Sequence, residues 1–451
     1  MVHIKFFYQY VASFSALLNM VSMGIHEAWT SVYLPQLLTP NKIVRITPNE
    51  ATWITLFFFF GTLLGCSVTL LTTDKFGRKV TILLTTVPFF LSFIALPYTK
   101  SVIYFCIIRI IAGIASGVNL VVIPLYIGEI ADPKIRGTLG TFIYIFNLIG
   151  FLLMNVIGSF VSISTSSLLS LILPLTVVLV FSWMPESPYY LAMKNDVDEA
   201  TKSLIKLKGT KNIEDETRKF LETVRLEIES QGKFSELFTK KTNRRALFIQ
   251  FILLNGKQFT GDDLFDVYAQ LIFGQFLDNI SPTVLVAVFY TVKLLVTIFS
   301  SLLIDKIGRR TILMFSFMFS GILLLLLGVY LHVKKYNDLG ALSFKYLAAT
   351  LLILFAIAYS FVAPVPAIIV GELFPMNVKV FASLLSEIYF CILSMVVIYF
   401  YEVTSKYFGA SVPFFTFAIS SLIHVVLVYL FVIETKGITL EDIQKTLNKT
   451  I

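Results

Sequence analysis

Two charged hexapeptides at corresponding places in the chain could form ion pairs. Asp74-Lys-Phe-Gly-Arg-Lys79 recurs 231 residues later as Asp305-Lys-Ile-Gly-Arg-Arg310, and each copy lies in a short hydrophilic gap between two long apolar segments. Basic side chains at the edge of an apolar segment are tolerated when carboxylates pair with them. The repeat therefore predicts an internally duplicated membrane protein, with one ion-pair network in each half and both networks on the same side of the bilayer.

Acidic partners for these networks recur with the same spacing. Glu129 precedes Arg136 by seven residues, and Glu372 precedes Lys379 by seven residues. We expect such pairs to join the two halves while a central site is open to the opposite side, and to separate when it opens to theirs. The alternative is that these charges only set the orientation in the membrane. The predicted network comprises Asp74, Gly77, Arg78, Lys79, Arg109, Glu129, Arg136 and Glu186 in the first half, and Asp305, Gly308, Arg309, Arg310, Glu372, Lys379 and Glu434 in the second.

A second set of polar residues lies inside apolar segments. An ionisable side chain in a membrane costs about 2.5–3.5 kcal/mol on insertion scales, so these groups must face each other or a water-filled cavity. A carboxylate beside a histidine could also bind and release a proton, which makes His26 and Glu27 candidates for proton coupling. The alternative places both at the outer mouth of their helix. The set comprises His26, Glu27, Lys257, Asp262, Asp263, Asp266 and Lys293.

Composition places the chain in a membrane. Of its 451 residues 57% are hydrophobic and 14% are charged, against about 25% charged in soluble domains. The net charge of +8 is typical of Lys and Arg retained in cytoplasmic loops, so we expect no nucleic-acid partner. The three cysteines lie in apolar runs and predict neither a disulfide framework nor a metal site. Without a phosphate-binding loop or a catalytic triad at recognisable spacing, we expect neither an enzyme nor a cofactor.

Segments of about 20 apolar residues predict twelve transmembrane helices. We expect 1–186 to form a six-helix bundle, 187–243 a cytoplasmic linker with short helices, 244–433 a second six-helix bundle, and 434–451 a cytoplasmic tail. A flexible linker is the alternative for 187–243. The predicted spans are 8–33, 51–72, 80–98, 102–127, 137–162, 166–184, 245–277, 281–304, 311–333, 345–370, 380–404 and 410–432.

Two local features refine this plan. Gly256 and Gly261 predict that the seventh span is broken or bent. Lys and Arg concentrate in the loops on the linker side, which predicts that both chain termini are cytoplasmic. The protein is therefore expected to be a multi-pass protein of the plasma membrane, in contact with the lipid bilayer.

Taken together and in order, these motifs resemble the sugar porter family of the major facilitator superfamily, over about Gly24 to Glu441. Pro185-Glu-Ser-Pro-Tyr-Tyr-Leu191, followed by Leu204 and Leu207-Lys-Gly209, is similar to the insect trehalose-transporter-like branch. The resemblance implies two six-helix bundles and a sugar carried by alternating access, as facilitated transport by a monomer. It implies no metal and no cofactor.

The resemblance also implies where a solute would bind. Gln258, Thr260 and Gly261 match the family's motif in the seventh span, in which amides bind sugar hydroxyls. Other positions depart from it: Lys257 replaces a Gln, Asp263 an Asn, and Tyr144 a sugar-binding Gln. The implied substrate site comprises Tyr144, Lys257, Gln258, Thr260, Asp263 and Lys293.

These departures leave three functional hypotheses open. The first is a facilitative carrier of a hexose or a disaccharide such as trehalose. The second is a carrier of another polar or charged solute, coupled to protons. The third is a sensor, or an inactive homologue, that keeps the shape of a transporter.

Overall fold

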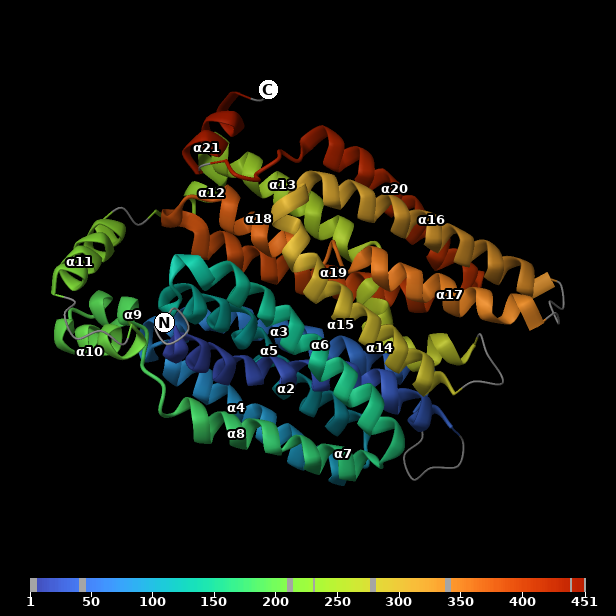
Figure 1. Ribbon diagram of the computed structural model, residues 1–451. Helices are drawn as coiled ribbons and strands as arrows, with labels where there is room; N and C mark the ends of the chain where they lie inside the picture. The colour runs from blue at the N-terminus through green and yellow to red at the C-terminus, as the bar shows by residue number, and fades with distance from the viewer. Residues whose placement is uncertain are drawn as a thin grey trace.

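The chain folds into helices alone in the part that its structure, a computed structural model, describes: 6–39, 46–208, 214–229, 232–275, 281–336, 342–438 and 440–449. Long helices run side by side to form an elongated bundle (Figure 1). Nine helices in this part are long and apolar enough to cross a membrane. Helix α2 (Phe7–Leu38) is not among them, and two further crossings are each made of two shorter helices in series.

The first half contains six crossings whose ends follow sequence signals. Thr47 and Glu50 form a capping box at the start of the helix that begins at Pro48. Asp132 accepts a hydrogen bond from the N–H of Lys134 at the start of the helix that begins at Pro133. These caps satisfy amide groups that no helical bond reaches. The helices are α2 (Phe7–Leu38), α3 (Pro48–Phe76), α4 (Arg78–Ala95), α5 (Val102–Ile130), α6 (Pro133–Phe160), α7 (Ile163–Ser170) and α8 (Ile172–Phe181).

The second half repeats this order with two interruptions. Gly261 has φ +77°, a left-handed conformation that favours glycine, and it separates α13 from α14 as the sequence predicted. A second break, at 360–364, precedes α18 and was not predicted. The helices are α13 (Lys241–Gln258), α14 (Asp262–Gly274), α15 (Pro282–Ile307), α16 (Arg309–Tyr336), α17 (Leu342–Tyr359), α18 (Val365–Leu373), α19 (Met376–Phe408), α20 (Ser411–Phe431) and α21 (Leu440–Lys449).

Four short helices connect the halves: α9 (Pro188–Met193), α10 (Val197–Lys208), α11 (Glu214–Glu229) and α12 (Glu236–Thr239). They lie at one end of the bundle, called here the linker end, and the opposite end is called the far end (Figure 1). Asp196 caps α10 by accepting from the N–H of Glu199. Val224 of α11 packs against Ala192 and Ala200, so this part of the linker is a folded cluster.

Glycines allow the first-half helices to approach closely. A Cβ on Gly113 of α5 would lie 2.2 Å from the carbonyl oxygen of Phe58, and one on Gly117 would lie 2.0 Å from that of Thr62, both on α3. Gly24 and Gly150 bring α2 and α6 together in the same way. Small residues are the usual means of helix contact in membranes, where lipid is as apolar as the side chains.

The two halves meet mainly along three helix pairs, α2 with α14, α3 with α19, and α6 with α15. In the described part of the chain, three hydrogen bonds between the halves lie near the far end. Gln270 donates from its backbone N–H to Ser31 Oγ (3.2 Å) and from Nε2 to Ser159 Oγ (3.0 Å), while Lys406 donates to Asn49 (3.4 Å). The far end is therefore closed by polar contacts between the halves.

Candidate functional site

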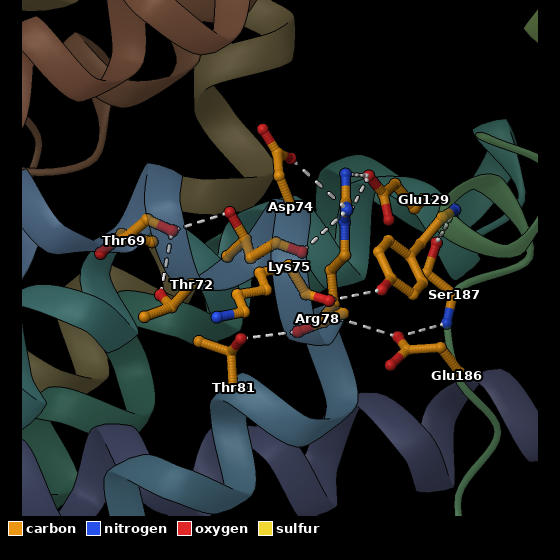
Figure 2. A network of polar contacts seen from close by, with 12 residues as sticks. Thr69, Thr72, Asp74, Lys75, Arg78, Thr81, Glu129, Glu186 and Ser187 are labelled. Atoms are coloured by element: carbon orange, nitrogen blue, oxygen red, sulfur yellow. Dashed lines mark hydrogen bonds and ion pairs between the residues drawn. The ribbon is translucent and has the colours of Figure 1, made fainter. Parts of the chain in front are cut away.

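Arg78 organises a charge network at the linker end of the first half. Its side chain is 4% exposed and donates from Nε and Nη2 to one carboxylate oxygen of Glu129, at 3.1 and 2.9 Å. Figure 2 shows Arg78 pointing toward Glu129, with Asp74 and Glu186 on either side. Asp74 is 3.9 Å from Arg78 and its side chain is 67% exposed, so it contributes a weaker, solvent-screened attraction.

Glu186 binds the start of α4 rather than a basic side chain. Its carboxylate accepts from the backbone N–H groups of Arg78 (3.1 Å) and Lys79 (3.0 and 3.1 Å), an arrangement that helix N-termini favour for anions. Gly77 has φ +91°, and a Cβ there would lie 2.4 Å from Glu186 Oε2. Partial burial, followed by the charge of Glu186, raises the pKa of the neighbouring Tyr190 phenol, which donates to the carbonyl of Lys75.

The second half repeats these contacts. Arg309 Nη2 lies 3.0 Å from Glu372, and Glu434 accepts from the N–H groups of Arg309 (3.0 Å) and Arg310 (3.1 Å). Gly308 has φ +110°, and a Cβ there would lie 2.6 Å from Glu434 Oε2. The glycine of each hexapeptide is therefore needed because a carboxylate occupies the space of its side chain.

These networks do not join the two halves in this conformation, and their joining the halves in the opposite conformation stays a prediction. The contacts of Arg78 and Arg309 described here stay within their own halves, so they stabilise each bundle and do not join the two. The reason is geometric, because each glutamate belongs to the same half as its arginine. The described structure joins the halves instead through Gln270, Ser31 and Ser159 at the far end.

Other predicted members lie apart from the networks. Arg109 is buried within the first half, where it lies over the ring of Phe58 (4.3 Å) and donates to the backbone carbonyl of His26. Arg136 and Lys379 each donate to a backbone carbonyl of their own half, that of Ala131 and that of Gly371. The side chain of Asp305 lies outside the described residues.

A buried ion-pair cluster lies where α13 breaks into α14. The ammonium of Lys293, on α15, is 0% exposed and lies 2.9 Å from both oxygens of Asp262 and 3.1 Å from Asp266. Tyr290 donates to the same oxygen of Asp266 at 3.1 Å. Asp262 and Asp266 are one helical turn apart, so one ammonium reaches both. This arrangement compensates much of the cost of these charges in a membrane.

A second hydrogen-bonded group lies beside this cluster. Asp263 Oδ2 accepts from Gln258 Nε2 at 2.9 Å and from Ser394 Oγ at 2.6 Å. The structure thus places Gln258, Asp263 and Lys293 in one region, as the resemblance implied. The carboxylates of Asp262, Asp263 and Asp266 approach within 4.8 Å of one another, which could suit a metal ion, but Lys293 already occupies two of them.

The remaining predicted binding residues surround this region less directly. Lys257 Nζ lies over the ring of Phe390, 4.8 Å from its centre. Thr260 is buried and its hydroxyl donates to the carbonyl of Lys257 (2.6 Å). Tyr144, from α6, lies within electrostatic range of Lys293, and its hydroxyl has no hydrogen-bond partner in the described structure.

His26 and Glu27 point to different surroundings although they are neighbours. His26 is buried in the first half, with Nε2 2.9 Å from Ser92 Oγ and its ring stacked on Phe93 (4.1 Å between centres). Glu27 accepts from Asn147 at 3.2 Å and lies within electrostatic range of Asp266 across the two halves. Only Glu27 therefore reaches the central region.

Sequence reasoning missed several members of the region. Ser394, Tyr290 and Asn147 are neutral polar residues in apolar runs, and a single sequence gives no signal to separate them from ordinary packing residues. Glu387 of α19 was also missed, and it lies within electrostatic range of Lys257. Its charge inside an apolar segment was a usable signal, the same one that marked Lys293.

Two bundles of repeated topology, with a charge network at one end of each and a polar cluster between them, define a major facilitator carrier. The fold agrees with solved structures of that class. The partially occluded inward-open xylose transporter XylE from E. coli has a TM-score of 0.80 at 18% identity, covering 96% of this chain and 99% of that one. XylE bound to 6-bromo-6-deoxy-D-glucose, a proton:xylose symporter of the major facilitator superfamily, has a TM-score of 0.76 at 19% identity, covering 98% and 99%.

The sequence comparisons identify the family. The model of the family described as "Sugar (and other) transporter" matches residues 8–447, so the chain belongs to this family. The facilitated trehalose transporter Tret1 of Bombyx mori is 28% identical over 443 residues, which cover 97% of this chain and 86% of the relative. The protein of the same name from Apis mellifera ligustica is 27% identical over 447 residues, covering 97% and 88%.

Proposed function

We propose that the protein carries a sugar across the membrane by alternating access. The observation that carries this proposal is the position of the polar region around Gln258 and Asp263, between the halves and at the break of the α13–α14 crossing. Broken helices at the interface of two repeats are where carriers bind their solutes. The trehalose transporters among the relatives support a hexose or a disaccharide as the solute.

The polar contacts between the halves indicate which conformation is present. Gln270, Ser31 and Ser159 close the far end, whereas the pairs of Arg78 with Glu129 and of Arg309 with Glu372 at the linker end each stay within one half. At that end Gly137 and Gly140 of α6 have no neighbouring atom within 4 Å of a built Cβ. The solute would thus enter or leave from the linker end in this state, and separation at Gln270 would open the other side.

The orientation follows from the distribution of basic residues. Lys75, Lys134 and Lys306, with the arginines of both networks, lie at the ends of α3, α4, α6, α15 and α16 that are nearest the linker. Cytoplasmic loops of membrane proteins are enriched in Lys and Arg, so the linker end and both chain termini face the cytoplasm. We propose a monomeric carrier in the plasma membrane, present here in an inward-facing state.

Uptake into proteoliposomes tests this function. Radiolabelled trehalose and glucose are measured separately, with and without a pH gradient, against liposomes that lack the protein. Saturable uptake that is indifferent to the gradient supports facilitated transport. Uptake that collapses with the gradient indicates proton coupling instead. Ligand-induced stabilisation without any flux would contradict the carrier and indicate a sensor.

A further inference from the structure

The centre of the protein holds more carboxylates than its nearby ammonium can neutralise. Asp262 and Asp266 share Lys293, at 2.9 and 3.1 Å. Glu27 of α2 and Asp263 of α14 lie on helices that pack against each other, and the charges of Asp263 and Asp266 both act on Glu27. Lys293 is paired with its two aspartates, and Arg109 is the weakest of the charged groups that act on Glu27, so Asp263 and Glu27 still need compensation from elsewhere.

Asp263 and Glu27 have only neutral hydrogen-bond partners among the described residues. Asp263, 8% exposed, accepts from the amide of Gln258 and the hydroxyl of Ser394 through its Oδ2 atom alone. Glu27 accepts from the amide of Asn147 through its Oε2 atom. Each carboxylate thus keeps one oxygen available, and the two come from opposite halves of the protein.

Two polar atoms without partners accompany these carboxylates. Gln258 is 0% exposed, and its Oε1 has no hydrogen-bond partner among the residues that the structure describes. The amide orientation is fixed, because Nε2 donates to both Asp263 Oδ2 and Ser394 Oγ at 2.9 Å. The Tyr144 hydroxyl, from the other half, is buried and also unpartnered, and its side chain interacts electrostatically with Lys293, Asp262, Asp266 and Asp263.

Unpartnered buried polar atoms are uncommon and usually indicate a missing ligand or water. Each half contributes one carboxylate and one neutral polar group that has an atom without a hydrogen-bond partner. A polyol that carries a positive charge would pair with all four groups. A protonated amine donates three hydrogen bonds, and bonds from an ammonium to carboxylates are about twice as strong as neutral ones. Hydroxyl groups would pair with the Gln258 carbonyl and the Tyr144 hydroxyl.

We propose that this site takes a sugar that bears a protonated primary amine, with the ammonium held between Glu27 and Asp263. The proposal rests on the sugar-carrier function proposed above and narrows its substrate class to cationic amino sugars. It gives a physical reason for the aspartate at position 263, since a neutral amide there would suffice for an uncharged sugar. Binding from both halves would also favour an occluded state in which the halves approach each other.

Glucosamine and N-acetylglucosamine provide the test, because the acetyl group removes the charge of the same amine. Binding is measured on the purified full-length protein by ligand-induced thermal stabilisation, and transport by uptake of each labelled sugar into proteoliposomes. We expect glucosamine to bind at least about tenfold more tightly than N-acetylglucosamine and glucose, a difference of about 1.4 kcal/mol. Equal or weaker binding of glucosamine would overturn the proposal.

Single substitutions test whether Asp263 and Glu27 are the residues that give the preference for glucosamine. Asp263→Asn, and separately Glu27→Gln, should abolish the preference for glucosamine over glucose. Asp198→Asn, an exposed aspartate of α10, is the matched control and should leave the preference unchanged. A preference that survives in both site variants, or an equal loss of binding of the charged and the neutral sugars, would overturn the assignment. Thermal unfolding of each variant without sugar, compared with the unmodified protein, shows that the variant is folded.

The same data separate this proposal from the proposed function. Transport of glucose with no preference for the amine would refute the cationic subsite and leave the sugar carrier intact. Glucose uptake that increases as the external pH falls, again without an amine preference, would show that the spare carboxylates carry protons only. Neither binding nor transport of any of these sugars would refute both proposals.

Discussion

Arg78 donates two hydrogen bonds to a single carboxylate oxygen of Glu129, and Arg309 binds Glu372 in the corresponding place of the second half. In both halves another glutamate accepts from the two N–H groups that open the next helix. The two networks share an arginine–glutamate pair and a glutamate at the start of the following helix, although their sequences share only the hexapeptide and spaced acids. Each network fixes the linker end of one bundle, so each bundle can move as a unit.

Replacing Gly77 by alanine should destabilise the first half. A non-glycine residue at φ +91° is strained by about 1–3 kcal/mol, and the added Cβ would lie 2.4 Å from Glu186 Oε2. We expect a lower free energy of unfolding and reduced transport, with the same result for Gly308→Ala. Thermal unfolding of purified variants in detergent measures the effect.

Gly140→Ala is the control for these variants. Gly140 lies within α6 and has no atom within 4 Å of a built Cβ, so alanine should be neutral or stabilise by up to about 1 kcal/mol. A Gly77→Ala protein as stable as Gly140→Ala would show that Glu186 does not constrain this turn.

Breaking the buried ion pair between Arg78 and Glu129 should lower the free energy of unfolding more than breaking an exposed ion pair. Removing one partner of a buried pair costs about 3–5 kcal/mol, and Glu129→Gln should approach the lower value because glutamine still accepts a hydrogen bond. Arg78→Gln in the same protein should recover part of the loss. A double-mutant cycle, read by thermal unfolding, gives the coupling between the two residues.

Glu199 and Lys202 provide the comparison for that cycle. They form an exposed pair on α10 at 2.6 Å, and exposed pairs contribute less than about 1 kcal/mol. A coupling between Arg78 and Glu129 no larger than that between Glu199 and Lys202 would argue against a structural role for the network.

Lys293→Met should leave Asp262 and Asp266 without their ammonium. Two carboxylates would then be unpaired in the membrane interior, so we expect poor thermal stability and loss of transport, with a cost of about 3–5 kcal/mol. Adding Asp262→Asn removes one of these charges and should restore part of the stability. If the double variant is no more stable than Lys293→Met alone, charge compensation is not what holds this cluster.

His26→Asn should leave the pH dependence of uptake unchanged, because His26 is enclosed by Ser92 and Phe93 within one bundle and does not reach the central region. Uptake is compared with that of the unmodified protein between about pH 5 and 8, where histidine ordinarily titrates. A pH dependence lost in His26→Asn would return this residue to the list of proton carriers.

The sequence predicted the crossings well because apolar length and charged gaps are local properties. The break at Gly261 followed from glycine at that position, and the cap of α10 followed from Asp196. The break before α18 was missed although Pro364 and Pro366 lie beside it, because proline within an apolar run is also tolerated in membrane helices.

The site was predicted only in part because pairing across helices is not a local property. Gln258, Asp263 and Lys293 were expected together, but their division into two groups depends on which side chains α15 and α19 present. The two neighbours His26 and Glu27 point to different environments, and no spacing rule separates them. The networks were predicted residue by residue, whereas their confinement to one half each was not.

Transport by alternating access requires the halves to separate at the far end. Ser159→Cys and Gln270→Cys, introduced into a protein whose cysteines at 66, 106 and 391 are replaced by alanine, place a thiol in each half where the native side chains lie 3.0 Å apart. A short thiol cross-linker that is cleaved by reductant should abolish sugar uptake, and reduction should restore it, while either single cysteine variant treated alike remains active. Uptake by the cross-linked protein at the rate of the uncross-linked one would contradict the account.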